Sequence, residues 1–127
     1  MKKLVLGIML ISLNSCDLFK SGINFEIDNQ TNSIVRDIKF YTSEKIKVIQ
    51  IEKINPNQKT INFLSMKDNK TDGHYILEFT RENGNIERIE AGYYTNGSVL
   101  NDLIQFKIKT DTTNIFLLWS QSSQKTL

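Results

Sequence analysis

Side chains that could perform chemistry are few in this chain. Its 127 residues include one cysteine, Cys16, and one histidine, His74. A single cysteine excludes a disulfide framework and a cysteine-rich zinc site, and a single histidine removes most histidine-based metal sites and catalytic triads. His74 has no serine, cysteine or carboxylate at a spacing typical of acid–base catalysis. We therefore expect a protein that is not an enzyme and that uses no metal and no cofactor.

Carboxylates gather around one predicted hairpin, where a pair of acids could serve glycoside hydrolysis. Arginines lie among them, and acids and arginines on the outer face of a hairpin more simply form cross-strand ion pairs, each stabilising by about a few tenths of a kcal/mol. These residues are Glu78, Glu82, Glu87, Glu90, Arg81 and Arg88. Upstream, Asp68–Gly73 resembles a calcium loop, but Lys70 and Phe79 occupy two ligand positions. We expect both segments to be solvated surface.

Tyr93 and Tyr94 are the candidates for a binding surface. Adjacent residues of a strand face opposite sides of the sheet, so we expect one of the two tyrosines to point outward. The Asn96-Gly97 turn follows directly. An exposed aromatic side chain beside a turn suits a protein or a glycan partner. The alternative is a tyrosine that only shields the sheet face.

The first sixteen residues carry the strongest signal in the chain. Lys2 and Lys3 precede an uncharged stretch of ten residues, 4–13. A helix of that length measures about 15 Å, about half of the hydrocarbon core of a bilayer. The stretch is too short to span a membrane and is typical of the apolar region of a signal peptide.

The end of this stretch, Leu13-Asn14-Ser15-Cys16, resembles the lipobox of bacterial lipoproteins. In that family the cysteine thiol receives diacylglycerol, a dedicated peptidase cuts just before the cysteine, and the new amino group is commonly acylated. The resemblance implies a signal peptide over residues 1–15 and a lipid on Cys16. It also implies a location in the bacterial cell envelope, on the inner or the outer membrane, facing the periplasm or the cell surface.

The charge of the mature chain argues against nucleic-acid binding. Removal of residues 1–15 from the 127 leaves 112 residues, with 14 basic and 14 acidic side chains because Lys2 and Lys3 are lost. A nucleic-acid-binding domain carries a clear basic excess. We expect the membrane as a partner, through the lipid anchor, and a protein or a glycan as a further partner.

The mature chain divides into a tether, a domain and a tail. Residues 16–22 form a short tether, and residues 120–127 form a polar tail. Between them, over residues 23–119, short apolar runs alternate with turn-forming clusters roughly every 8 to 12 residues, which is typical of an all-β sandwich or barrel. We expect an antiparallel two-sheet β-sandwich of immunoglobulin type with seven or eight strands. Its strand pattern and the segment Gly92–Gly97 are similar to small β-sandwich lipoproteins of Bacteroidota.

Four local features refine this prediction. The parity of the apolar residues slips between Ile46 and Ile54, which predicts a bulge near Val48-Ile49. Asn83-Gly84 and Asn96-Gly97 both predict type I′ hairpin turns. The segment 98–103 fits either a helical turn capped by a serine or an extended chain, and the segment 115–119 predicts a final buried strand.

These observations favour a membrane-anchored lipoprotein with a non-catalytic binding or structural β-sandwich domain. The alternative is an inhibitor or immunity protein directed against a secreted or periplasmic enzyme or toxin.

Overall fold

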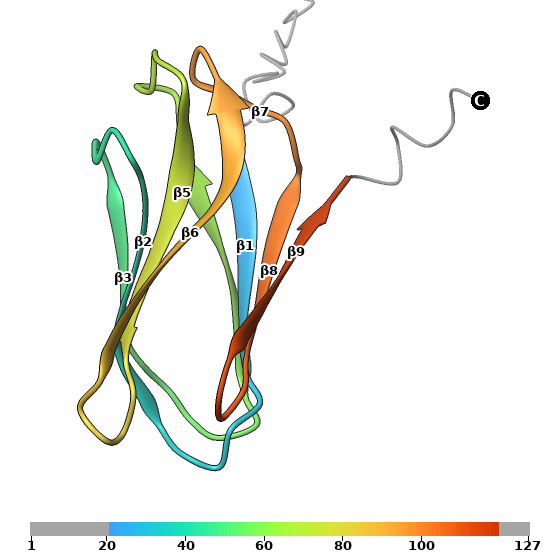
Figure 1. The fold of residues 1–127 in the computed structure, drawn as a ribbon. Helices are drawn as coiled ribbons and strands as arrows, with labels where there is room; N and C mark the ends of the chain where they lie inside the picture. Colours follow the sequence, from blue (N-terminus) through green and yellow to red (C-terminus); the bar gives the residue numbers. More distant parts are fainter. Residues whose placement is uncertain (1–20, 120–127) are drawn as a thin grey trace, which may run out of the picture.

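The computed structural model describes residues 21–119, and within them the chain is all β (Figure 1). The predicted signal peptide 1–15, Cys16, most of the tether 16–22 and the tail 120–127 lie outside the described residues. No helix among residues 21–119 is long and apolar enough to cross a membrane. The described strands are β1 (Gly22–Asn29), β2 (Val35–Thr42), β3 (Val48–Ile54), β4 (Lys59–Ser65), β5 (Gly73–Thr80), β6 (Ile86–Thr95), β7 (Ser98–Val99), β8 (Leu103–Ile108) and β9 (Thr113–Leu118).

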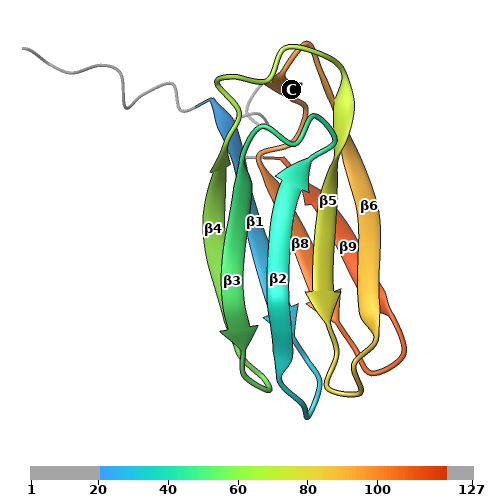
Figure 2. The same ribbon diagram turned by 90° about the vertical axis from the view of Figure 1, so that its left-hand side faces the viewer.

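The strands form two packed sheets, so the predicted sandwich is confirmed. The four-stranded sheet has the order β4-β1-β8-β9 and the five-stranded sheet the order β3-β2-β5-β6-β7. Figure 2 shows the five-stranded sheet in front of the four-stranded one. Neighbouring strands run antiparallel except β1 and β8, which are parallel. The described residues contain nine strands instead of the expected seven or eight, because β7, two residues long, pairs with the end of β6.

The strand order resembles that of an immunoglobulin-like domain in part, but among the described residues no strand D lies beside β4, and β7 and β9 are additional. The order β3-β2-β5-β6 corresponds to strands C′, C, F and G, and the pair β1–β4 to strands B and E. Strand A normally lies beside B on the other side from E. Here β8, from the C-terminal part of the chain, takes that place and runs parallel to β1.

The core lies between the sheets and is built mainly by inward-facing residues of β1, β2, β5 and β8. The rings of Phe25 from the four-stranded sheet and Phe40 from the five-stranded sheet stack with centroids 4.0 Å apart. The ring centroids of Phe106 and Tyr75 lie 5.9 and 6.0 Å from that of Phe40. All four side chains are almost completely buried. Burial of each such side chain stabilises the fold by roughly 1.5–3 kcal/mol.

The predicted bulge at Val48-Ile49 is wrong. β3 pairs with β2 in one continuous register, from Tyr41 opposite Val48 to Val35 opposite Ile54. The irregularity lies in β2, where Asp37 has φ 51° and the pairing with β5 shifts. Ile46, one of the residues on which the prediction depended, precedes the strand and is exposed.

The two Asn-Gly pairs form different turns. Asn96 and Gly97 both have positive φ, 50° and 75°, as the predicted type I′ turn requires. At the β5–β6 turn only Gly84 has positive φ, and its N–H donates to the carbonyl of Arg81 at 2.9 Å. This is a longer hairpin connection, with a turn followed by a left-handed glycine, so type I′ is wrong there. In the ambiguous segment 98–103, Ser98-Val99 forms β7 rather than a helical turn.

Candidate functional site

The two candidate tyrosines lie on opposite sides of β6. Tyr93 is 47% exposed, whereas Tyr94 is completely buried. The pKa of the Tyr93 hydroxyl is raised, first by partial desolvation and then by the carboxylate of Asp72. Because Tyr94 has no exposed surface, it is corrected from a surface residue to a core residue. Tyr93 is therefore the member of the pair that a partner could contact, and its binding role stays a prediction.

Tyr94 belongs to a polar cluster under the β4–β5 connection. Its hydroxyl donates to Glu44 Oε1 at 2.9 Å, and Asn69 Nδ2 donates to the same oxygen at 3.1 Å. Asn69 Nδ2 also donates to Thr42 Oγ1 at 2.9 Å. Desolvation opposes ionisation of Glu44, but the hydrogen bonds from Asn69 and Tyr94 outweigh it and lower the pKa of that carboxyl. The cluster fixes the connection 66–72, which explains its order despite its polar composition.

The calcium-like segment within this connection is committed to internal hydrogen bonds. Asn69 points into the polar cluster, and Asp72 Oδ1 accepts from the backbone N–H of Asn96 at 2.9 Å. The segment therefore joins the β4–β5 connection to the β6–β7 turn. No group of three or more potential metal ligands lies together anywhere in residues 21–119.

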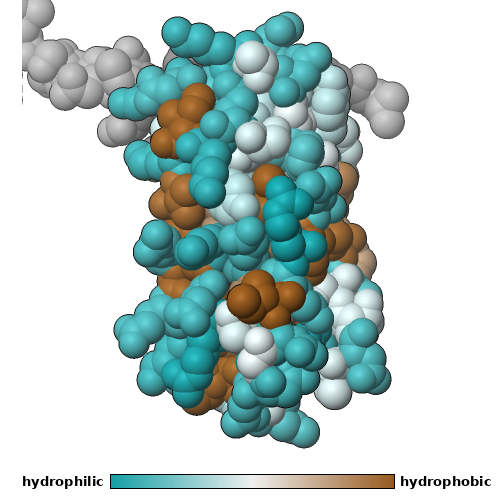
Figure 3. All heavy atoms as spheres, turned by 60° about the vertical axis from the view of Figure 1, so that its left-hand side comes forward, coloured by the Kyte–Doolittle hydropathy of each residue, from teal (hydrophilic) through white to brown (hydrophobic). Residues whose placement is uncertain are grey.

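The outer face of the five-stranded sheet carries a chain of hydrogen bonds and ion pairs. Tyr41 donates to Glu78 Oε1 at 2.9 Å, and Arg88 lies 3.7 Å from Glu78 and 2.6 Å from Glu90. His74 Nε2 lies 3.4 Å from Glu90 Oε2. Figure 3, which brings the β2–β3 side forward, shows mostly hydrophilic side chains with hydrophobic ones in separate patches. We call this set of five residues the charged chain.

The charged chain is poorly suited to glycoside hydrolysis. Such a reaction needs one acid whose pKa is raised so that it can donate a proton. The hydrogen bond from Arg88, followed by the charge of His74, instead lowers the pKa of Glu90. Glu78 and Arg88 form the cross-strand pair that the sequence predicts, whereas Arg88 and Glu90 pair within β6.

Glu87 departs from the expected outer face. It lies opposite Phe79, which is buried, so its side chain starts on the inner face of the sheet. Arg81 binds it with two nitrogens, at 2.7 and 3.2 Å, and donates with Nη1 to the carbonyl of Lys109 at 2.8 Å. This bridge ties the β5–β6 turn to the β8–β9 turn. The Arg81 guanidinium and the Glu87 carboxylate thus help to hold the two sheets together.

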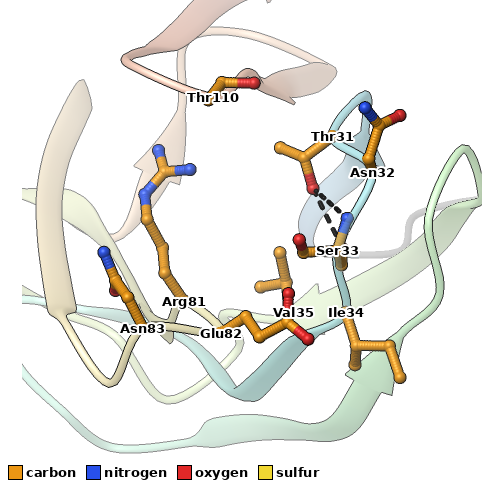
Figure 4. Close-up of a pocket in the computed structure, with 9 residues that line it drawn as sticks. All are labelled: Thr31, Asn32, Ser33, Ile34, Val35, Arg81, Glu82, Asn83 and Thr110. Carbon is orange, nitrogen blue, oxygen red and sulfur yellow. Dashed lines mark hydrogen bonds between the residues drawn. The ribbon is translucent and has the colours of Figure 1, made fainter.

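A groove of about 490 Å³ lies at the same end of the domain (Figure 4). Its lining comes from three connections that are distant in sequence: Thr31, Asn32, Ser33, Ile34, Val35, Arg81, Glu82, Asn83 and Thr110. Sequence patterns miss this site because only the fold brings the three connections together. Thr31 Oγ1 donates to the carbonyl of Ser33 at 2.9 Å, and Arg81 is engaged by Glu87. Two of the lining side chains, those of Thr31 and Arg81, are thus used in contacts within the protein.

β9 is more exposed than the sequence predicts. Instead of a buried strand, it is an edge strand of the four-stranded sheet. Its large apolar side chains are all at least 37% exposed, together with the tryptophan that follows: Ile115, Phe116, Leu117, Leu118 and Trp119. Leu117 faces the core side, but opposite it on β6 stands Gly92, whose missing side chain leaves Leu117 partly uncovered. The prediction of a buried final strand is wrong because an edge strand has a neighbour on one side only.

Comparisons with known proteins identify no family for this chain. No protein-family model matches the chain, and no curated protein matches it. Among solved structures, the chain is similar to the NMR structure of a protein from Eubacterium rectale. The two are 11% identical, the match covers 80% of this chain and 93% of that chain, and the TM-score is 0.49. At this level of similarity nothing about function follows.

Proposed function

We propose that the protein is a bacterial lipoprotein. In this proposal a lipid on Cys16 holds it on an envelope membrane, and its β-sandwich acts by binding or by supporting envelope structure rather than by catalysis. The observation that carries the proposal is the motif Leu13–Cys16 at the end of a charged and then apolar N-terminal stretch. The anchored domain would belong to the small β-sandwich lipoproteins that the sequence resembles.

The geometry of the domain is consistent with a short tether. β1 begins at Gly22, so five residues separate the first strand from Cys16. Fully extended, the segment from Cys16 to Gly22 spans at most about 20 Å. The domain would therefore stay within about its own radius of the lipid surface.

A non-catalytic role is supported by the state of the chemically active side chains. His74 and Glu90 are partners on an open face, and Arg81 and Glu87 bridge two turns. Arg81 and Glu87 are hydrogen-bonded to each other, and Glu90 accepts a hydrogen bond from Arg88. Tyr93, exposed beside the β6–β7 turn, is the residue we propose as a contact for a protein or glycan partner.

The proposal is tested by replacing the cysteine in the full chain. We expect Cys16→Ser to abolish incorporation of labelled palmitate and to leave an unprocessed precursor that migrates more slowly on electrophoresis. Less of the variant protein should remain bound to membranes until detergent is added. Ser15→Ala is the matched control, because it keeps a small residue before the cysteine and should be processed normally. Normal processing and labelling of Cys16→Ser would disprove the lipidation.

A further inference from the structure

The end of the domain at which β1 begins is also the end at which β9 finishes. β1 and β8 are parallel, with Asn24 opposite Leu103, and Leu103 in turn lies opposite Leu118 of β9. Neighbouring strands are about 4.8 Å apart, so Leu118 lies about 10 Å across the sheet from Asn24, near the start of β1. Figure 1 shows both ends of the described chain at this same end of the sandwich.

Four large apolar side chains are exposed at this end, and we call them the β9 patch. Trp119 is 60% exposed, and the other three members are 37–43% exposed: Leu100, Leu117 and Leu118. Leu100 belongs to the connection that leads into β8, and the carbonyl of Leu118 accepts a hydrogen bond from the N–H of Asp102 in that connection at 3.0 Å. Leu117 and Leu118 are successive residues of β9 and point to opposite faces of the sheet, so the β9 patch is the apolar end of an edge strand rather than one flat face. Exposed apolar side chains at one end of a domain mark a contact surface more often than scattered ones do.

We propose that the β9 patch rests on the surface of the lipid bilayer to which Cys16 tethers the domain. The inference depends on the proposed lipidation, since the tether from Cys16 to Gly22 reaches at most about 20 Å. At that distance the bilayer is present at a high effective concentration, so a small apolar patch is sufficient for contact. Tryptophan prefers the interface between membrane and water, where its ring is apolar and its N–H can still find a partner.

The backbone of β9 limits how deeply the patch can enter. Among the described strands β9 pairs with β8 alone, so its other edge presents backbone N–H and C=O groups. The hydrocarbon core offers no hydrogen-bond partners for such groups. The patch therefore lies at the level of the lipid headgroups, with the backbone edge still reached by water.

The chain contains a single tryptophan, so fluorescence reports on the β9 patch without any label. The lipidated full-length protein is reconstituted into vesicles of phosphatidylethanolamine and phosphatidylglycerol that carry bromine at a shallow or a deep acyl position. We expect shallow bromine to quench Trp119 by about half, deep bromine to quench it less, and aqueous acrylamide to quench it less than in the unfolded chain.

The matched control moves the fluorophore to the opposite end of the domain. Trp119→Phe removes the native probe, and Ile86→Trp introduces a new one at the start of β6, where Ile86 is 76% exposed. We expect this second probe to be insensitive to brominated lipid and accessible to acrylamide. The pair of proteins thus separates contact by the β9 patch from a domain that merely lies near the vesicle.

Two results would overturn the membrane contact while the lipoprotein proposal stands. Trp119 open to acrylamide and insensitive to bromine would show that the patch stays in water. Trp119 shielded from both quenchers would show that protein covers it, as in a second copy paired along the edge of β9. A protein that never fractionates with membranes, and whose cysteine carries no lipid, would instead overturn the lipoprotein proposal itself.

Discussion

The outer faces of the two sheets differ in character. The face of the five-stranded sheet is polar and ion-paired, whereas the β9 edge of the four-stranded sheet is apolar. On the five-stranded sheet, Tyr41, Glu78, Arg88 and Glu90 bind one another across three strands. On the four-stranded sheet, Glu26 of β1 meets Lys59 of β4 at 3.5 Å and Gln105 of β8 at 2.8 Å. The outer positions of β9 are apolar and exposed, among them Phe116 and Leu118.

The two faces differ in whether their exposed side chains need a partner. A face whose polar side chains satisfy one another needs no partner, and it adds little stability because its ion pairs are exposed. A face that ends in an apolar edge strand is a liability unless something covers it or uses it. The charged chain therefore satisfies its own polar groups, whereas the β9 patch is the region for which we propose contact with another surface.

The largest effect is expected from the core that both sheets share. Phe40→Ala removes a ring that contacts Phe25, Tyr75 and Phe106, and a buried aromatic-to-alanine change costs about 3–5 kcal/mol. Urea unfolding measures the loss. Phe116→Ala, on the exposed outer face of β9, is the matched control and should cost less than about 1 kcal/mol. Equal losses in the two variants would contradict the placement of Phe116.

The adjacent tyrosines give a second comparison at a single site. Tyr94→Phe removes a buried hydroxyl that donates to Glu44, and the expected cost is about 1–3 kcal/mol. Tyr93→Phe removes an exposed hydroxyl and should change the stability by less than about 0.5 kcal/mol. Thermal unfolding of both variants provides the measurement. A larger loss for Tyr93→Phe would show that the two residues are assigned to the wrong sides of β6.

The charged chain should make a small, pH-dependent contribution to stability. The pKa of Glu90 is lowered in the fold, chiefly by Arg88, so its stabilising effect is present above the ordinary glutamate pKa of 4.5 and is lost as pH falls through the lower folded value. Arg88→Ala should therefore lower the urea midpoint slightly at about pH 7 and hardly at all at about pH 3. Lys39→Ala, an exposed neighbour, serves as the control. An unchanged difference at the two pH values would contradict the ion pair.

The smallest effect on stability is expected at the β9 patch. Leu118→Ser replaces a side chain that is 37% exposed, and the free energy of unfolding should change by less than about 0.5 kcal/mol. If the patch touches lipid, the same change should reduce quenching of Trp119 by shallow brominated lipid. A stability loss comparable with that of Phe40→Ala would show instead that Leu118 belongs to the core.

Local patterns were enough to predict much of the sandwich. Ile23, Phe25 and Ile27 alternate with polar residues and are all buried, because a strand turns successive side chains to opposite faces. The same period decides that Tyr93 and Tyr94 lie on opposite sides of β6. Asn96-Gly97 forms the predicted turn because both residues tolerate positive φ. Each of these features depends only on neighbours in the chain.

Tertiary pairing decided the rest. An apolar strand has the same sequence pattern at a sheet edge as in a sheet centre, so the exposure of β9 follows only from its place beside β8. Tyr94 finds its acceptor 50 positions away in Glu44, and the parallel pairing of β8 with β1 joins Glu26 to Gln105 across 79 positions. The sequence by itself determined which faces of the strands are apolar. The fold decided which of those faces are covered, because coverage depends on residues that no local period can relate.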